Sequence, residues 1–302
     1  MNTTQKRNLL AKAAGGYVTL QPIAKNKIAE VYYRRAMTQE MERMLESMVA
    51  EIKRAYTTIP MQNAKMSDAE RYTRLRTILE RLRRQYGSKL DKNAEKIIKK
   101  YMGKAADGIL KSILKNMRTV YGPDYGIIDF DKRKYGRLLK ARGTTNAELI
   151  KNTTSQIISN VTNITYDGVT TGQSWTAVEK DLRTQKRIAA DRIKRIARDQ
   201  TAKLNENLNE MSQRDAGIEF FEWMTANDER VSTGYGGHKQ LNGKIYKWGD
   251  TAHYPIIDSY GHRGTPAQRV NCRCTALPVV LRKDFVARQT AQGDWVITKG
   301  RL

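Results

Sequence analysis

Apolar residues recur every three or four positions through about the first two thirds of the chain, which is the spacing of one face of an α-helix. The first run covers residues 37–56, and Pro60 ends it because proline cannot continue a helix. A second run follows Ser67 and Glu70, which stand three residues apart as in a capping box, and we expect it to end at Gly87. A chain patterned in this way folds into long helices that pack through their apolar faces.

Further helices are predicted along the same region. One has its apolar positions in residues 94–117 and ends at YGPDYG, residues 121–126, which is rich in turn-forming residues. Residues 144–170 hold more β-branched side chains, but their apolar positions still fit a helical face better than a strand. Ser174 can cap a helix that begins at the next residue, and a longer helix follows through residues 188–211.

The pattern changes at Gly217. The stretches IEFFEWMTA, KIYKW, CRCTALPVVL and DWVIT are typical of short strands, with glycines and prolines between them. We therefore predict a mainly α protein, in which an elongated helical N-terminal region precedes a small C-terminal α+β module. Its predicted parts are a basic helical region at 1–140, a helical part leading into the module at 141–216, the α+β module at 217–282 and a C-terminal extension at 283–302.

The chain is strongly basic. It holds 55 lysines and arginines against 31 aspartates and glutamates, a net charge of +24. Such a surplus repels itself unless a polyanion or an acidic partner neutralises it, and double-stranded DNA is the first candidate, ahead of an anionic membrane. No base-reading motif is recognisable, so we expect contacts to the phosphate backbone only. The predicted DNA-binding residues are Arg71, Arg74, Arg81, Arg83, Arg84, Arg183, Lys186, Arg187, Arg192, Lys194, Arg195 and Arg198.

Two features bear on the compartment. The N-terminal stretch is basic but holds no apolar core of signal-peptide length, and no stretch approaches about 18 uninterrupted apolar residues, so we expect neither secretion nor a membrane anchor. Cys272 and Cys274, separated by one residue, cannot join distant parts of the chain by a disulfide, which favours a reducing compartment.

All three histidines and both cysteines of the chain lie within the predicted α+β module. Zinc is commonly held by four ligands of these kinds, and thiolates at alternate positions of a strand point to the same face. A structural zinc ion would use Cys272, Cys274, His238 and either His262 or His253. The alternative is that no cofactor is required and that the module holds small buried thiols and hydrogen-bonded histidines; the spacing leaves both open.

A metal-dependent DNA nuclease is the enzymatic alternative. Such an enzyme needs a general base near its metal, and Asp228 and Glu229 precede His238 in the sequence. The same carboxylates are common in turns, and here they follow an aromatic strand. A tyrosine recombinase is disfavoured because GHRG, residues 261–264, lacks the second arginine at the required offset.

A set of ordered elements resembles a known family. It comprises a helix with IARDQTAKLN, an aromatic strand ending in Trp223, the sequence DERV, a histidine before LNGK, and a closing CRC followed by a proline. Spread over about 90 residues, these elements together are far more specific than a single short motif. They resemble the phage head-morphogenesis family of minor head proteins, the Mu F-like group.

The resemblance implies a virion protein that is not an enzyme. Members of this family are present in few copies inside the capsid near the portal vertex, where they assist head assembly and genome packaging or ejection. The implied partners are the portal protein, the packaged DNA and other head proteins, and the protein would be made in the host cytoplasm. With this resemblance, the metal-dependent DNA nuclease of the alternative hypothesis would act during packaging or after ejection, and a portal adaptor without a DNA role is a third hypothesis.

The resemblance also implies where a metal site would lie. Many members have a cysteine pair before the element that corresponds to LNGK, and Tyr235 and His238 stand at those positions here. His262 corresponds to a histidine upstream of the last cysteines, and Cys272 and Cys274 to the final pair. The implied metal ligands are therefore His238, His262, Cys272 and Cys274.

Overall fold

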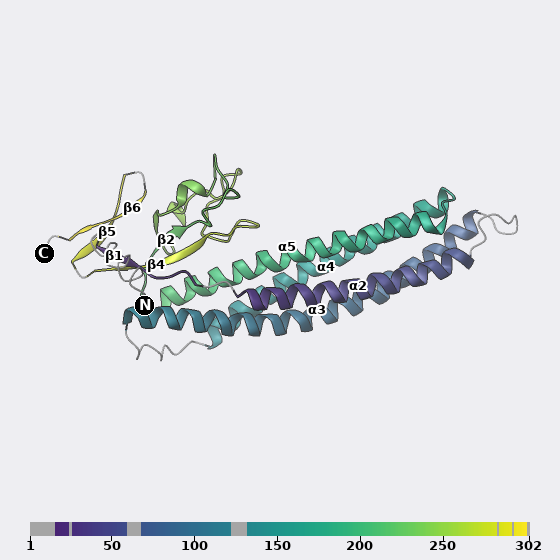
Figure 1. The fold of residues 1–302 in the computed structure, drawn as a ribbon, viewed down its shortest axis with the longest axis horizontal. Coiled ribbons are helices and arrows are strands. Elements are labelled where there is room, and N and C mark those ends of the chain that lie inside the picture. Colours follow the sequence, from purple (N-terminus) through teal and green to yellow (C-terminus); the bar gives the residue numbers. More distant parts are fainter. Residues whose placement is uncertain are drawn as a thin grey trace. The chain divides into compact units, whose positions relative to one another are not determined.

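Four long helices and a small antiparallel sheet make up the computed structural model (Figure 1). The helices are α2 (Lys27–Thr58), α3 (Asp68–Tyr121), α4 (Lys132–Thr170) and α5 (Trp175–Asp215). The prediction of a mainly α protein with a small α+β module is confirmed. The structure describes residues 16–23, 26–58, 68–121, 132–282, 284–291 and 293–300.

Gly87 does not end a helix, and that prediction is wrong. Helix α3 continues through it for 54 residues in all. A glycine inside a helix costs only about 1 kcal/mol relative to alanine, whereas Leu82, Tyr86 and Leu90 on either side of it are all buried. Burial of one uninterrupted apolar face therefore outweighs the local cost.

The predicted helix ends agree better with the structure. Helix α3 ends at Tyr121, where the turn-rich YGPDYG begins, and the amide of Ala177 lies 3.3 Å from the Ser174 hydroxyl that caps α5. The two helices predicted after Ser174 are one continuous helix, α5. Pro60, Ser67 and residues 122–131 lie outside the described residues.

The chain divides into two compact units. The helical unit consists of residues 27–104 and 137–198, and the sheet unit takes residues up to 26, 105–136 and 199–302. Helices α3, α4 and α5 each contribute to both units. The division therefore follows contacts in space and not the sequential parts predicted from the sequence.

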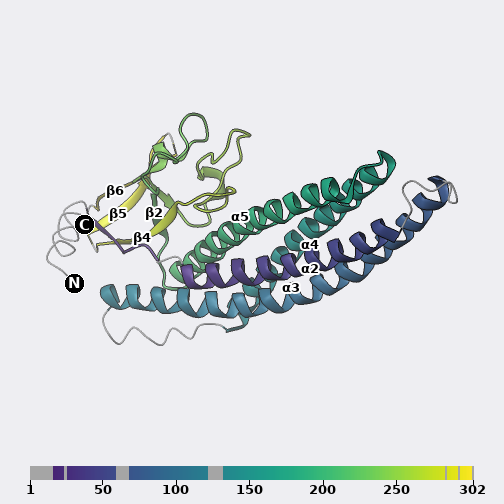
Figure 2. The same ribbon diagram turned by 45° about the vertical axis from the view of Figure 1, so that its right-hand side comes forward.

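Interlocking aromatic and polar side chains hold the core of the helical unit. The rings of Tyr33 in α2 and Tyr101 in α3 stack with their centroids 4.5 Å apart, and the Tyr33 hydroxyl donates to the Asn146 side chain of α4 at 3.1 Å. In both views α2 lies beside α3 and α4 beside α5 (Figures 1 and 2). Further fully buried residues of α2 and α3 are Met37, Met41, Met48, Ile52, Leu75, Leu79 and Leu82.

Acidic side chains of α2 bind cations and a hydroxyl on two neighbouring helices. Glu51 accepts from Arg81 at 2.9 Å and from the Tyr86 hydroxyl at 2.7 Å, both in α3. Glu46 accepts from Lys186 of α5 at 2.6 Å. Part of the positive charge of α3 and α5 is therefore neutralised by acidic residues of the same chain, in ion pairs at the surface.

The sheet has six antiparallel strands in the order β1-β4-β2-β3-β6-β5. The strands are β1 (Tyr17–Thr19), β2 (Phe220–Met224), β3 (Ile245–Lys247), β4 (Thr275–Leu281), β5 (Phe285–Gln289) and β6 (Trp295–Lys299). Two of them, β1 and β5, were not expected from the sequence. The sheet thus extends beyond residues 217–282 at both of its edges.

The two faces of the sheet bury different residues. Phe221 and Trp223 of β2 point into one apolar cluster, in which Phe221 stacks on Trp248 at 4.0 Å between ring centroids. Phe220, one position away, packs with Ile245 in a second cluster. This alternation is what a strand covered on both faces requires.

Polar side chains of α5 take the place of a neighbouring strand along part of β4. Strand β1 pairs only with residues 279–281, so the backbone of Ala276 has no strand beside it on that edge. There Glu206 accepts from the Ala276 amide at 3.1 Å, and Asn209 donates to the Ala276 carbonyl at 2.8 Å. Gln213 supports Asn209 at 2.8 Å and accepts from the Trp248 indole at 2.8 Å.

We predict that Asn209→Ala lowers the free energy of unfolding by about 1–3 kcal/mol, because it removes the closer of two donors to the buried Ala276 carbonyl and leaves only Gln213 at 3.5 Å. Urea denaturation followed by tryptophan fluorescence measures the change, since Trp223 and Trp248 lie in the sheet unit. The matched control is Asn163→Ala, an exposed helical asparagine that should change stability by less than about 0.5 kcal/mol. Equal losses of stability for the two variants would show that Asn209 does not hold β4.

Candidate metal centre

His238 is held by its backbone at the start of a short 3₁₀ helix, η1 (Lys239–Leu241). Its amide donates to the Ser232 hydroxyl at 3.1 Å, and the residue is 4% exposed. The glycine before this turn is required by geometry: Gly236 has a φ of +65°, and a Cβ there would lie 2.2 Å from the carbonyl oxygen of Asp258. Tyr235, by contrast, is exposed.

The ring of His238 is oriented by two neighbours. Its Nε2 atom lies 3.0 Å from the carbonyl oxygen of Ile257, and the ring meets the edge of Trp223 at 5.3 Å between centroids. A carbonyl oxygen can only accept, so Nε2 carries the proton and donates it. In the neutral ring the lone pair is then on Nδ1.

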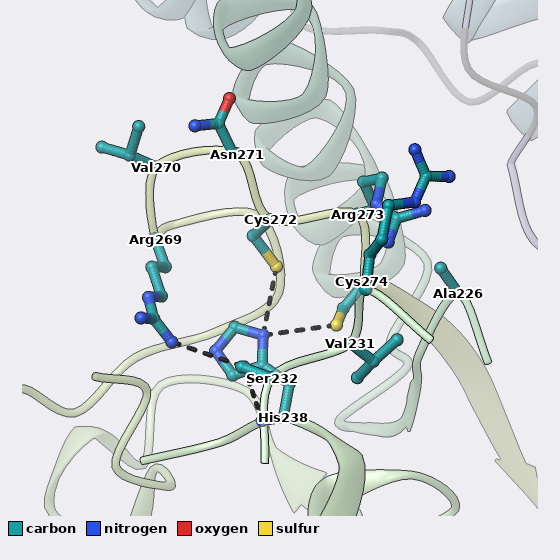
Figure 3. A pocket seen from close by; sticks show the side chains of 11 residues that line it. Ala226, Val231, Ser232, His238, Arg269, Val270, Asn271, Cys272, Arg273 and Cys274 are labelled. Atoms are coloured by element: carbon teal, nitrogen blue, oxygen red, sulfur yellow. Dashed lines mark hydrogen bonds between the residues drawn. The ribbon is translucent and has the colours of Figure 1, made fainter. Parts of the chain in front are cut away.

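The sulfur atoms of both cysteines lie close to Nδ1 of His238. The Sγ atoms of Cys272 and Cys274 are each 3.4 Å from His238 Nδ1, and the three atoms lie within 4.8 Å of one another (Figure 3). The pKa of the Cys272 thiol is lowered, first by its hydrogen bond with Cys274 and then by His238, against the effect of burial. Burial lowers the pKa of His238, but its interactions with Cys272 and with the Ile257 carbonyl together outweigh burial, so that the pKa is raised.

The cysteines do not lie on a strand, and that expectation is wrong. Strand β4 begins at Thr275, and the cysteines stand in the extended segment just before it. A turn at Asn271, with a φ of +62°, leads into this segment, and its amide donates to Asp199 of α5 at 2.9 Å. Helix α5 thus sets the path of the loop, so both sulfurs still reach the same atom.

Arg273, between the two cysteines, is tied to the DERV sequence. Its guanidinium binds both carboxylate oxygens of Asp228, with Nη2 2.6 Å from Oδ1. Arg230 binds the same carboxylate at 3.1 Å. The Arg273 contact is the main reason why the pKa of Asp228 is lowered. Asp228, the candidate nuclease base, is therefore engaged in ion pairs, and Glu229 is exposed.

The other two histidines lie apart from this cluster. His262 Nδ1 is 2.8 Å from Asp258, and His253 Nδ1 is 2.7 Å from Asp250. Within the described part of the chain, the structure brings together His238, Cys272 and Cys274 and does not bring His262 to them. The sequence offered no signal for this choice, because all three histidines lie in glycine-rich or irregular segments.

The cluster fits a zinc ion. Bonds of about 2.3 Å to sulfur and 2.0 Å to nitrogen at tetrahedral angles set the ligand atoms roughly 3.5–3.8 Å apart. The two sulfur–nitrogen distances, 3.4 Å each, are close to that range without rearrangement. Thiolate and imidazole donors favour zinc over magnesium or calcium. The Nε2 hydrogen bond to a backbone carbonyl is the usual outer contact of a zinc-bound histidine.

A pocket of about 210 Å³ borders the cluster. All three ligand residues line it, together with Arg230, Arg269 and other residues of the same loops. Arg269 is turned toward Ser232, with Nη1 3.4 Å from the hydroxyl (Figure 3). Ser232 and Asp199 were not singled out in the sequence, because their role is to hold backbone and no side-chain spacing reveals it.

The predicted DNA-binding residues lie on α3 and α5, and some of them form ion pairs with acidic residues. The side chain of Arg71 is outside the described residues. Three others form ion pairs in the helical unit: Arg81 with Glu51 at 2.9 Å, Arg183 with Glu179 at 2.7 Å and Lys186 with Glu46 at 2.6 Å. Arg192 is half-buried, and the exposed members of the set include Arg74, Arg83, Arg84, Arg187, Lys194, Arg195 and Arg198.

The excess of positive charge is concentrated on α3. Helix α3 has 15 lysines and arginines against six acidic residues, whereas α5 has ten against seven. Beyond the predicted residues, Lys92, Lys96 and Lys99 of α3 are exposed and form no ion pair with the described residues. Counting charge helix by helix would have revealed them.

Comparison with known proteins identifies one segment of the chain. Residues 159–277 match the family described as "Phage Mu protein F like protein". This range runs from the last turns of α4 to the start of β4 and contains the whole ligand cluster. The match indicates a phage head protein.

A curated relative covers more of the chain. An uncharacterized protein of Haemophilus influenzae is 24% identical over 274 residues, which is 89% of this chain and 57% of the relative. The chain thus spans little more than half of that protein's length. No solved structure matches. The resemblance seen in the sequence is supported by the family match: residues 159–277, with His238, Cys272 and Cys274 among them, are similar to the phage Mu protein F-like family.

Proposed function

We propose that this protein is a minor head protein that acts at the portal vertex inside the capsid. It would assist head morphogenesis and genome packaging or ejection, with the portal protein and other head proteins as partners. The observation that carries the proposal is the family match over residues 159–277 in a chain of net charge +24. A large positive charge suits a protein that works beside packed DNA.

The proposal assigns DNA contact to the exposed face of α3 in the helical unit. Arg84, Lys92, Lys96 and Lys99 are exposed and follow one another at eight, four and three residues, which places them on one face of the helix. The acidic side chains of α2 bind cations elsewhere, as Glu51 does with Arg81. Glu95 of α3 is exposed on the same face, but no ion pair among the described residues joins it to these four cations, so they are available for phosphate groups.

Phosphate contact of this kind is independent of sequence. Lysine and arginine on a solvent-exposed helix reach backbone phosphates without reading base edges. Affinity then comes from the release of counterions and falls steeply with salt. None of the helices in the described ranges has an apolar stretch long enough to span a membrane.

We predict that the protein retards duplex DNA of any sequence at about 50 mM salt and loses affinity by orders of magnitude at about 200 mM, as expected for several phosphate contacts. Replacement of Arg84, Lys92, Lys96 and Lys99 by glutamine should flatten the slope of log K against log salt by about 0.9 for each phosphate that is no longer neutralised. Fluorescence anisotropy with two unrelated duplexes measures both effects.

The control removes the same charge elsewhere. Glutamine at Lys239, Lys244, Arg288 and Lys299, which are exposed in the sheet unit, changes the net charge by the same amount. This variant should keep most of the salt slope. If both variants lose affinity equally, bulk charge and not the face of α3 governs binding, and the assignment to α3 is wrong.

We predict no cleavage of supercoiled plasmid by the purified protein with magnesium, manganese or zinc. The engagement of Asp228 by Arg273 and Arg230 argues against a free base beside the cluster. Agarose gels of nicked and linear products measure the outcome. Cleavage that His238→Ala abolishes would contradict the structural role and establish the nuclease alternative.

A further inference from the structure

We propose that His238, Cys272 and Cys274 bind one zinc ion whose fourth coordination position is filled from outside this cluster, by an oxyanion of the phosphate type that enters the arginine-lined pocket. This proposal goes beyond a role in head assembly and does not depend on the face of α3. It concerns only residues of the sheet unit.

The number of protein ligands is the first step. Zinc sites that serve only structure usually close with four protein ligands, whereas sites with three keep a position open to an outside ligand. Among the residues that the structure describes, the cluster contains three donors. His262 is turned to Asp258 and Asp228 to Arg273, so neither is presented to the two sulfurs.

The orientation of the three donor atoms also supports a metal site. Ile257 fixes the tautomer of His238 by accepting from Nε2, which leaves Nδ1 facing both sulfurs. Trp223 holds the ring edge-on in the apolar cluster that also buries Cys274. Donors that are already oriented before binding lose little freedom when a metal ion arrives.

The charge of the pocket is the third step. Arg230, Arg269 and Arg273 line it, and no acidic residue is part of its described lining. Arg273 and Arg230 are partly neutralised by Asp228, whereas the guanidinium of Arg269 faces the neutral hydroxyl of Ser232. A site with a cationic metal and a guanidinium on its wall favours an oxyanion over a neutral ligand.

Metal stoichiometry and cobalt(II) substitution test the ligand set. The 302-residue chain should bind one zinc ion, and its cobalt form should show thiolate-to-cobalt charge transfer. Cys272→Ser and His238→Ala should weaken binding at least about tenfold, whereas His262→Ala and His253→Ala should leave it unchanged. Less than about one tenth of an ion per chain, or equal weakening with His262→Ala, would overturn the three-ligand site. Circular dichroism checks that each variant is folded.

Titration of the cobalt protein with anions tests the open position. Inorganic phosphate should change the visible cobalt bands saturably, and Arg269→Gln should weaken this response at least about fivefold while cobalt affinity stays the same. A short duplex DNA, added in a separate arm, tells whether a phosphodiester can also enter.

Two results would contradict this part of the proposal. Cobalt bands that neither phosphate nor DNA alters would overturn the open position, and a phosphate response unchanged in Arg269→Gln would overturn the role of the pocket arginine. The DNA affinity of the α3 variants is measured separately, so failure of one proposal leaves the other standing.

Discussion

The structure of the sheet unit depends on the hydrogen bonds between α5 and the backbone around β4. Glu206 and Asn209 bind the amide and carbonyl of Ala276, and Asp199 binds the amide of Asn271. A strand edge would otherwise leave these groups unpaired in a buried place, at a cost comparable to a missing hydrogen bond for each. Cys272 and Cys274 lie between Asn271 and Ala276, the two residues that α5 binds. Helix α5 therefore determines where both sulfurs lie, although it contributes no residue to the ligand cluster.

Ion pairs have different effects in the helical unit and in the sheet unit. In the helical unit, the acids of α2 neutralise particular cations, such as Arg81 and Lys186, and so leave the excess on the outer face of α3. In the sheet unit, Asp228 draws the side chain of Arg273 away from the sulfurs on either side of it. A guanidinium at the sulfurs would repel a metal ion. Pairing of opposite charges therefore leaves one surface cationic in the helical unit and directs the Arg273 guanidinium to Asp228 in the sheet unit.

Much of the helical fold could be predicted from the sequence, because apolar periodicity is local and burial follows it. Helix ends with strong chemical signals, at Tyr121 and Ser174, were predicted correctly, whereas Gly87 was overruled by the packing of its neighbours. The ligand cluster was harder to predict from the sequence. Which histidine meets the cysteines depends on the turn of Gly236 against Asp258 and on Ile257, contacts between segments that no spacing encodes. Strand β1 was missed because its partner lies at the other end of the chain.

The alternating directions of the Cys272, Arg273 and Cys274 side chains make this segment sensitive to insertions. In an extended backbone, neighbouring side chains point to opposite sides, so the sulfurs share one side and the guanidinium takes the other. Inserting a single residue would exchange the two sides and carry a positive group toward His238. The length of this segment is therefore constrained between the anchor at Asn271 and the first residue of β4.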